Sequence, residues 1–154
     1  LGARNRTHRD NAVVNTGSIK DVMFTQIQGT RISMLGSALS GVPGQLIENV
    51  LLRDVSLEFV GGGTAEHAKR AVPENIKGYP GSTMFGAALP AYGFFVRHAK
   101  NILFDDVHLR FAVDDHRPAI VCDDVDGVTF QRMRAQTLPG IEAQRLVNTR
   151  DVTR

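Results

Sequence analysis

The sequence contains a single cysteine, Cys122, and no tryptophan among its 154 residues. One cysteine excludes an internal disulfide and any zinc site built from cysteines. The chain also lacks an apolar run of about 18 residues or more, so the sequence predicts no membrane-spanning helix. Neither sign of charge dominates, because 18 basic residues oppose 16 acidic ones and leave a formal charge of +2. We therefore expect neither nucleic acid nor a membrane as a partner.

No targeting signal is visible at the start of the chain. Leu1 is not an initiator methionine, and neither a basic nor an apolar segment of a signal peptide follows it. We therefore expect the chain to begin inside a larger domain, and its compartment does not follow from a leader. Hydrophobic residues make up 42% of the chain, which allows a sizeable core, and 15 glycines favour a β-rich domain with many turns.

A short pattern recurs along the chain: Asn, Asp or Gly, then Val or Ile, then any residue, then usually an apolar residue. Its copies begin at Asp21, Asn49, Asn101, Gly127 and Asp151. The Val or Ile residues of successive copies are separated by 28, 52, 26 and 24 residues, so one interval is doubled. Such a period is typical of a parallel β-helix, in which each winding supplies short strands to a shared core.

Other repeat folds agree less well with this pattern. Leucine-rich repeats have a similar period but need leucine at several fixed positions, whereas only the Val or Ile position recurs here. Helical repeats need apolar faces with a period of about 3.6, whereas residues 47–59 alternate in the manner of a strand. We therefore predict an all-β chain that forms part of a parallel β-helix over residues 1–154, with a long inserted loop at residues 61–92.

The repeat also predicts which side chains stack on one another. One inward column contains Val22, Val50, Ile102, Val128 and Val152, and the next contains Phe24, Leu52, Phe104 and Phe130. Strand alternation places Arg97 beside Asp123 on the outer face, and Val96 beside Cys122 on the inner face. The same alignment gathers His98, Asp124 and Asn148 into a polar column at a corner.

Several motifs occur in a characteristic order over residues 1–135. They include Ser40-Gly41-Val42-Pro43-Gly44, Gly61-Gly62-Gly63-Thr64, Lys77-Gly78-Tyr79-Pro80, Leu89-Pro90-Ala91-Tyr92-Gly93 and Arg117-Pro118-Ala119-Ile120. Together they resemble glycoside hydrolase family 28, the polygalacturonases and related pectin-cleaving enzymes, most closely in its bacterial branch. The resemblance implies a right-handed parallel β-helix that hydrolyses glycosidic bonds with inversion, usually next to galacturonic acid. It also suggests a secreted or periplasmic protein.

The catalytic motifs of this family are missing from the sequence. Inverting hydrolysis needs a carboxylic acid and a carboxylate far enough apart to admit a water molecule. The family places these groups in Asn-Thr-Asp and Asp-Asp motifs, followed by Gly-His-Gly and Arg-Ile-Lys motifs. The sequence contains no Asn-Thr-Asp, Gly-His-Gly or Arg-Ile-Lys. We therefore predict the C-terminal coils of such a hydrolase, with no catalytic residue and no hydrolysis by this chain alone.

Three Asp-Asp pairs, at 105–106, 114–115 and 123–124, superficially resemble a glycosidase site. Neighbouring residues on a strand point to opposite faces, so adjacency alone does not form a catalytic pair. We interpret the first pair as a bend and the second as a turn. The five histidines are scattered without the spacing of metal ligands, so we expect neither a metal nor a cofactor.

Four residues are candidates for contacting a sugar. Tyr79 and Tyr92 offer aromatic faces for sugar C–H groups, and Tyr92 is favoured because it directly precedes an outward-facing strand. Arg97 presents a planar fork to a uronate carboxylate, with Asp123 beside it. The alternatives are that Arg97 and Asp123 form only a surface ion pair between windings, and that the inserted loop only covers the flank.

Three functions remain open from the sequence. The favoured one is the C-terminal part of an inverting hydrolase that acts on pectic polysaccharide or oligosaccharide. The alternatives are a non-catalytic β-helix module that binds carbohydrate or serves as an adhesin, and a purely structural segment. We also expect association through an exposed end of the β-helix, because the first winding leaves strand edges and apolar surface uncovered.

Overall fold

The computed structural model describes residues 16–78, 81 and 84–154. Strands dominate this part of the chain and are accompanied by one helix, so the predicted all-β class is confirmed. The elements are β1 (Ile19–Ile32), β2 (Ser37–Ser40), β3 (Ile47–Gly61), α1 (Ala65–Lys69), β4 (Phe94–Val113), β5 (Ile120–Gln131), β6 (Arg134–Ala135) and β7 (Gln144–Thr153). The described residues contain no helix with the length and apolar character needed to cross a membrane.

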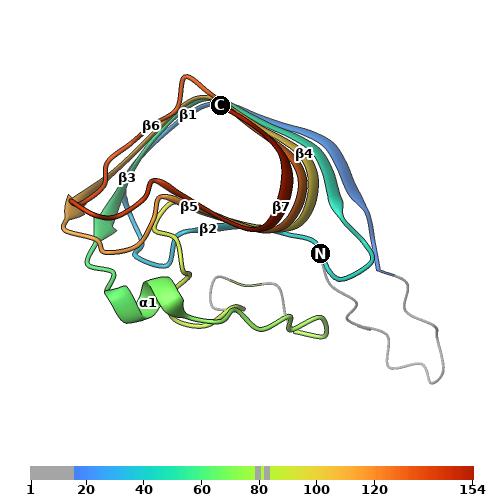
Figure 1. Cartoon of the computed structure of the whole chain (residues 1–154), viewed down its shortest axis with the longest axis horizontal. Helices are drawn as coiled ribbons and strands as arrows, with labels where there is room; N and C mark the ends of the chain where they lie inside the picture. The colour runs from blue at the N-terminus through green and yellow to red at the C-terminus, as the bar shows by residue number, and fades with distance from the viewer. Residues whose placement is uncertain (1–15, 79–80, 82–83) are drawn as a thin grey trace.

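All the described strands belong to one open sheet with parallel pairing. The main order is β1-β3-β4-β5-β7, and the short β2 and β6 both pair with β4. β4 has 20 residues and is the longest strand, so β2 and β3 pair with different parts of it, as do β5 and β6. Figure 1 shows the long strands bending around a shared interior, each lying over its neighbour.

The strands bend where a residue adopts positive φ. The repeated Asp21, Asn49, Asn101, Gly127 and Asp151 all do so, with φ between 53° and 84°. Asn, Asp and Gly tolerate this left-handed conformation better than most residues do. Side chains also connect the bends, because the Asn49 amide donates to Asp21 at 2.7 Å and the Asn101 amide donates to Asn49 at 3.0 Å. The polar position of the sequence repeat is therefore a corner.

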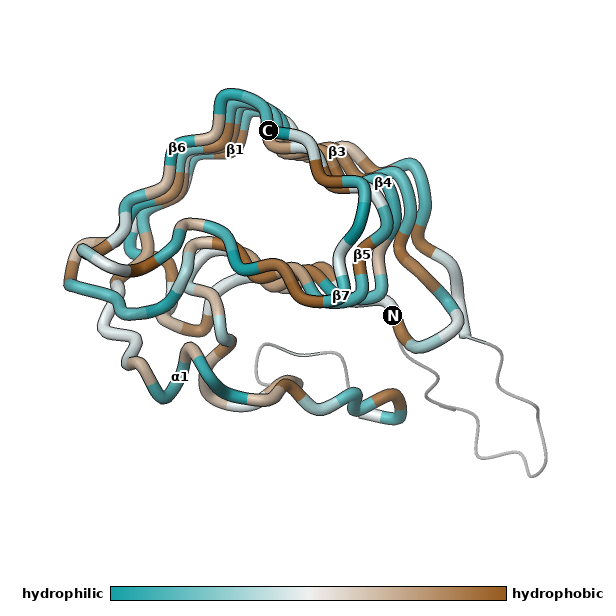
Figure 2. Tube along the Cα trace, in the orientation of Figure 1, coloured by the Kyte–Doolittle hydropathy of each residue, from teal (hydrophilic) through white to brown (hydrophobic). Residues whose placement is uncertain are grey.

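Both predicted inward columns are confirmed by the strand pairing. It aligns Val22, Val50, Ile102, Val128 and Val152 in one column and Phe24, Leu52, Phe104 and Phe130 in the next. From β3 to β5 these residues are at most 5% exposed. The rings of Phe104 and Phe130 stack with their centroids 5.4 Å apart. Figure 2 shows hydrophobic segments recurring at the same place from one stacked strand to the next.

The described residues between β3 and β4 pack against the outside of the sheet and form what we call the covering segment. It begins with α1, whose N-terminus is capped by Thr64. Further along, Leu89 and Ala91 bury Phe95 and Val121, two residues that face outward from β4 and β5. The sheet therefore has an apolar cluster on each side at this point, and only part of its outer surface remains open (Figure 1).

Candidate functional site

Tyr92 belongs to the core and offers no face to a sugar. It is 0% exposed, and its ring packs edge-on against Phe59 and Phe111 at centroid distances of 5.8 and 5.3 Å. The hydroxyl donates to the Gln136 carbonyl at 2.9 Å and lies 3.2 Å from the Leu109 carbonyl. Burial raises the pKa of this hydroxyl. The prediction that Tyr92 stacks on a sugar is therefore wrong, because Phe59 of β3 and Phe111 of β4 pack against the ring and leave it no exposed face.

Arg97 is held by the covering segment and is only 3% exposed. Its guanidinium donates to the carbonyls of Val72 and Pro73 at 2.8 and 3.0 Å. Its Nη1 also lies 3.2 Å from the Glu74 carboxylate. A uronate carboxylate therefore has no access to the fork of Arg97, and the prediction of such a contact is wrong. Tyr79, the remaining aromatic candidate, lies outside the described residues.

Asp123 is the neighbour of Arg97 in the strand register, as predicted. The guanidinium of Arg97 nevertheless turns towards Glu74 in the covering segment, so the expected ion pair between windings is replaced by one with that segment. Asp123 instead acts on Arg145 of β7. Burial lowers the pKa of Arg145, and the Asp123 carboxylate opposes that shift.

His98 and Asp124 occupy the polar corner column that the repeat predicts. Their φ angles are 48° and 57°, and Asn148 continues the column with a φ of 46°. The Nδ1 atom of His98 lies 2.6 Å from Asp124, and its Nε2 atom lies 3.1 Å from Glu74. The imidazole therefore connects β5 with the covering segment through both of its nitrogens.

Each Asp-Asp pair has a carboxylate that is committed to a cationic or imidazole side chain. Asp105 accepts a hydrogen bond from Arg53 at 3.0 Å and also pairs with Arg132. Its neighbour Asp106 has a φ of 57°, so this pair lies at a bend, as predicted. Asp124 is held by His98. These contacts give the carboxylates of Asp105 and Asp124 a structural role in holding neighbouring strands together.

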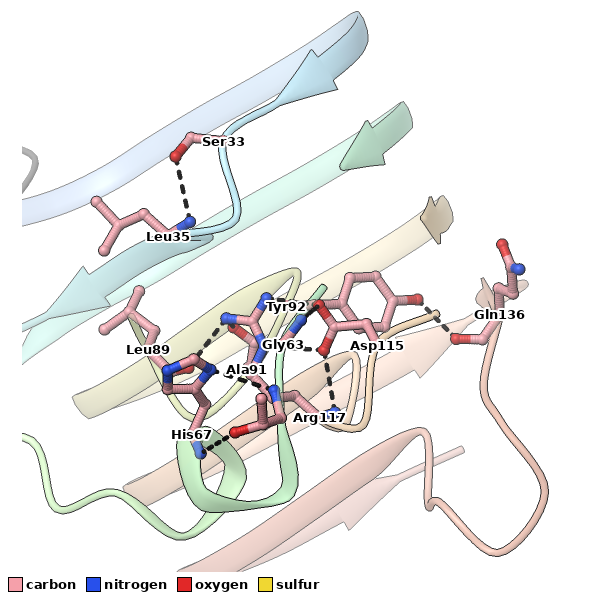
Figure 3. A network of polar contacts seen from close by, with 11 residues as sticks. Ser33, Leu35, Gly63, His67, Leu89, Ala91, Tyr92, Asp115, Arg117 and Gln136 are labelled. Carbon is pink, nitrogen blue, oxygen red and sulfur yellow. Dashed lines mark hydrogen bonds and ion pairs between the residues drawn. The ribbon is translucent and has the colours of Figure 1, made fainter. Parts of the chain in front are cut away.

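Asp115 and Arg117 form a buried ion pair that the sequence analysis missed (Figure 3). Both side chains are 0% exposed, and their charged atoms lie 2.7 Å apart. Asp115 also accepts from the Gly63 amide, and Arg117 donates to the carbonyls of Leu89 and Ala91. Burial alone raises the pKa of Asp115, but the hydrogen bonds and charge of Arg117 bring it below its usual value. A Cβ atom on Gly63 would lie 2.1 Å from Arg117 Nε, so glycine is required there.

A polar depression of about 300 Å³ lies where β3, β4 and β6 run side by side. Its lining consists of Ser56, His108, Leu109, Arg110, Arg134, Ala135 and Gln136. Strand register explains this set, because Ser56 pairs with His108 and His108 pairs with Arg134. Polar side chains from three stacked strands therefore meet at one place on the outer surface.

The charged groups of this polar depression differ in whether they already have a hydrogen-bond or ion-pair partner. Arg110 donates to Glu58 at 3.0 Å, and His108 lies 3.2 Å from Asp106. The guanidinium of the exposed Arg134 has no hydrogen-bond or ion-pair partner among the residues that the structure describes. An available guanidinium beside imidazole, hydroxyl and amide groups can bind a carboxylate together with neighbouring hydroxyls.

Sequence reasoning overlooked the polar depression, although a signal for it was present. His108 and Arg134 are 26 residues apart, which equals one interval of the repeat, and Ser56 and His108 are separated by the doubled interval of 52. Residues at these spacings share a column. Extending the period from the apolar positions to the polar ones would therefore have gathered all three side chains.

The remaining chemistry-bearing groups have structural places. Cys122 is buried in the core, and burial raises the pKa of its thiol to about 12, which disfavours the nucleophilic thiolate. Within residues 16–78, 81 and 84–154, no group of three or more His, Cys, Asp or Glu side chains is arranged to hold a metal ion.

Comparisons with protein-family models, with curated proteins and with solved structures find no match for this chain. The resemblance of its motifs to the polygalacturonases stays a prediction.

Proposed function

We propose that the chain is part of a right-handed parallel β-helix that binds acidic carbohydrate, within a protein related to the polygalacturonases of glycoside hydrolase family 28. Parallel, in-register pairing along β1, β3, β4, β5 and β7 supports the β-helix. The ordered sequence motifs support the family and, through it, the hand of the winding. Galacturonate-containing polysaccharide is the partner class that this family implies.

The uncommitted guanidinium of Arg134 in the polar depression gives the strongest support for acidic-carbohydrate binding. A galacturonate unit carries a planar carboxylate beside ring hydroxyls. A guanidinium can hold the carboxylate with two parallel hydrogen bonds. Ser56 and Gln136 line the same depression and carry hydroxyl and amide groups that suit the ring hydroxyls. A neutral sugar would use only this second set of contacts.

The ion pairs and hydrogen bonds of the aspartates favour binding over bond cleavage by this chain. Inverting hydrolysis needs two positioned carboxyl groups with room for water between them. Asp105 and Asp115 are each tied to arginine, and Asp124 is tied to His98. We therefore expect no release of reducing ends from polygalacturonate by this chain alone. Hydrolysis that disappears on replacing Asp123 or Asp124 with Asn would overturn this assignment.

Titration with trigalacturonate and with a neutral galacto-oligosaccharide of the same length tests the binding role. Calorimetry should show binding of the acidic ligand and at least about tenfold weaker binding of the neutral one. Added salt should weaken the acidic ligand selectively, because exposed charges are screened. Equal affinities for the two ligands, or no binding of either, would contradict the proposal.

Arg134→Ala locates the site. We expect this variant to bind trigalacturonate about tenfold more weakly, because it loses a charge-assisted contact. Lys100→Ala is the matched control, since Lys100 is an exposed cation of β4 that does not line the polar depression. An equal loss of affinity in both variants would indicate attraction by overall charge and would remove the depression as the site.

A further inference from the structure

β1 is the outermost strand at one end of the described sheet, and its core positions are apolar. Within the described residues it pairs only with β3. Ile19, Phe24 and Ile27 of β1 are 36–39% exposed. Their partners one winding later, Ile47, Leu52 and Val55, are at most 4% exposed. Among the residues that the structure describes, no strand therefore covers these core positions at the edge of β1.

The strand register defines the geometry of a matching cover. The columns that pass through β3, β4 and β5 reach β1 without a break. Only a further parallel strand, bent at the same corner, continues these columns and pairs the open backbone edge. It must carry apolar residues opposite Ile19, Val22, Phe24 and Ile27. This spacing is the one that β3 itself presents to β1.

Polar groups at the same edge add a second requirement. The ammonium of Lys20 lies 2.9 Å from Glu48, which stands between Lys20 and Lys100 in the strand register. Asp21 ends the corner ladder as an acceptor, because it receives the Asn49 amide and a carboxylate has no N–H to donate. A cover therefore needs an acidic residue opposite Lys20 and a donor such as asparagine opposite Asp21.

The other end of the stack does not meet these requirements. β7 lies in the same columns, so a second copy stacked head to tail would set Arg150 against Lys20 and Asp151 against Asp21. Like charges directly opposite one another destabilise a sheet. Repulsion at both positions disfavours an open chain of identical copies.

We infer that the β1 edge is a docking surface for one further parallel β-winding with the chemistry of β3. The occupant carries apolar residues at the four column positions, an acidic residue opposite Lys20 and asparagine opposite Asp21. This inference does not depend on carbohydrate binding at the polar depression, and its probe is a peptide.

A labelled peptide with the sequence of residues 47–57 tests the docking surface on the full chain. We expect saturable one-to-one binding by fluorescence anisotropy. A second peptide carrying the changes Glu48→Lys and Asn49→Asp reproduces the charges of β7 and should bind at least about tenfold more weakly. Equal binding of the two peptides would overturn the inference, as would head-to-tail association of the chain without peptide binding.

Two variants distinguish binding at the docking surface from nonspecific hydrophobic binding. Phe24→Asp should abolish peptide binding, whereas Met23→Asp should leave it unchanged, because Met23 is 63% exposed and belongs to an outward column. Equal losses in these two variants would contradict the assignment of Phe24 to the docking column.

Lys20→Glu tests the charge requirement and keeps the apolar surface. It should weaken binding of the first peptide and strengthen binding of a peptide that carries only Glu48→Lys. Failure of this charge exchange would also count against the inference.

Discussion

Arg97 and Arg110 both point outward from β4, yet they have different surroundings. Arg97 lies beneath the covering segment, where two backbone carbonyls and Glu74 hold its guanidinium. Arg110 lies on the open part of the sheet, exposed beside the polar depression and paired with Glu58. An outward position on a strand therefore does not by itself make a residue accessible.

This contrast divides the outer surface of the sheet into a region covered by the covering segment and a region open to solvent. In the covered region, charged side chains hold a long segment against the sheet and are shielded from ligands. In the open region, Arg110 and Arg134 remain within reach of solvent. Substitutions in the covered region should therefore change stability, and substitutions in the open region should change binding.

Arg117→Ala should have the largest effect on stability. It leaves the Asp115 carboxylate buried without its partner, and breaking a buried ion pair costs about 3–5 kcal/mol. Urea denaturation measures the loss. Arg150→Ala is the control, because it breaks an exposed Arg–Asp pair and should change stability far less than Arg117→Ala does. Similar losses for the two variants would contradict the distinction between covered and open regions.

Arg97→Ala should destabilise the fold by about 1.5–3 kcal/mol, because it removes hydrogen bonds between a buried guanidinium and the covering segment. Proteolysis within residues 62–93 should accelerate. Affinity for trigalacturonate should stay unchanged, in contrast to Arg134→Ala. A selective loss of acidic-ligand affinity in Arg97→Ala would return this residue to the binding site.

Acid should weaken the buried ion pair between Asp115 and Arg117. The pKa of Asp115 in the folded protein lies below its ordinary value of 3.8. Its charge therefore stabilises the fold above pH 3.8, and that contribution disappears as the pH falls through the lowered folded value. The difference in unfolding free energy between wild type and Asp115→Asn should shrink over this range. A difference that does not change with pH would show that the charge of Asp115 is irrelevant.

Glu58→Gln should give the smallest effect and concerns the open region. Glu58 accepts a hydrogen bond from Arg110, and under the proposed binding role this contact competes with the ligand carboxylate, so neutralising Glu58 should raise trigalacturonate affinity about two- to fivefold. Stability should change by less than about 1 kcal/mol, since the guanidinium of Arg110 is exposed and Glu58 is partly exposed. Unchanged or weaker affinity would argue against Arg110 as a ligand contact.

The periodic part of the fold could be predicted from sequence because parallel stacking repeats the same environment in each strand. A period near 26 residues therefore aligned Val50 with Ile102 and Val128, and Arg97 with Asp123. Alternation also placed Cys122 in the core. These are properties of the backbone register, which depends on local pattern and spacing.

Side-chain partners in the covering segment were not predictable in the same way. Arg97 is bonded to carbonyls 24 and 25 residues away, in a segment without a repeat. Tyr92 immediately precedes Gly93 and Phe94, and its hydroxyl is satisfied by a carbonyl 44 residues away. Alternation within β4 gives no information about a residue that precedes the strand.

The separation of paired residues has a consequence for the folding pathway. β4 and β5 pair residues that are 26 positions apart, whereas β3 and β4 pair residues that are 52 apart because the covering segment lies between them. Contacts between distant residues form late, since the intervening chain must close first. We therefore expect β4 and β5 to associate before β3 joins them. Closure entropy rises only logarithmically, by about 0.6 kcal/mol for each doubling of length, so an insertion at this point slows assembly more than it weakens the finished fold.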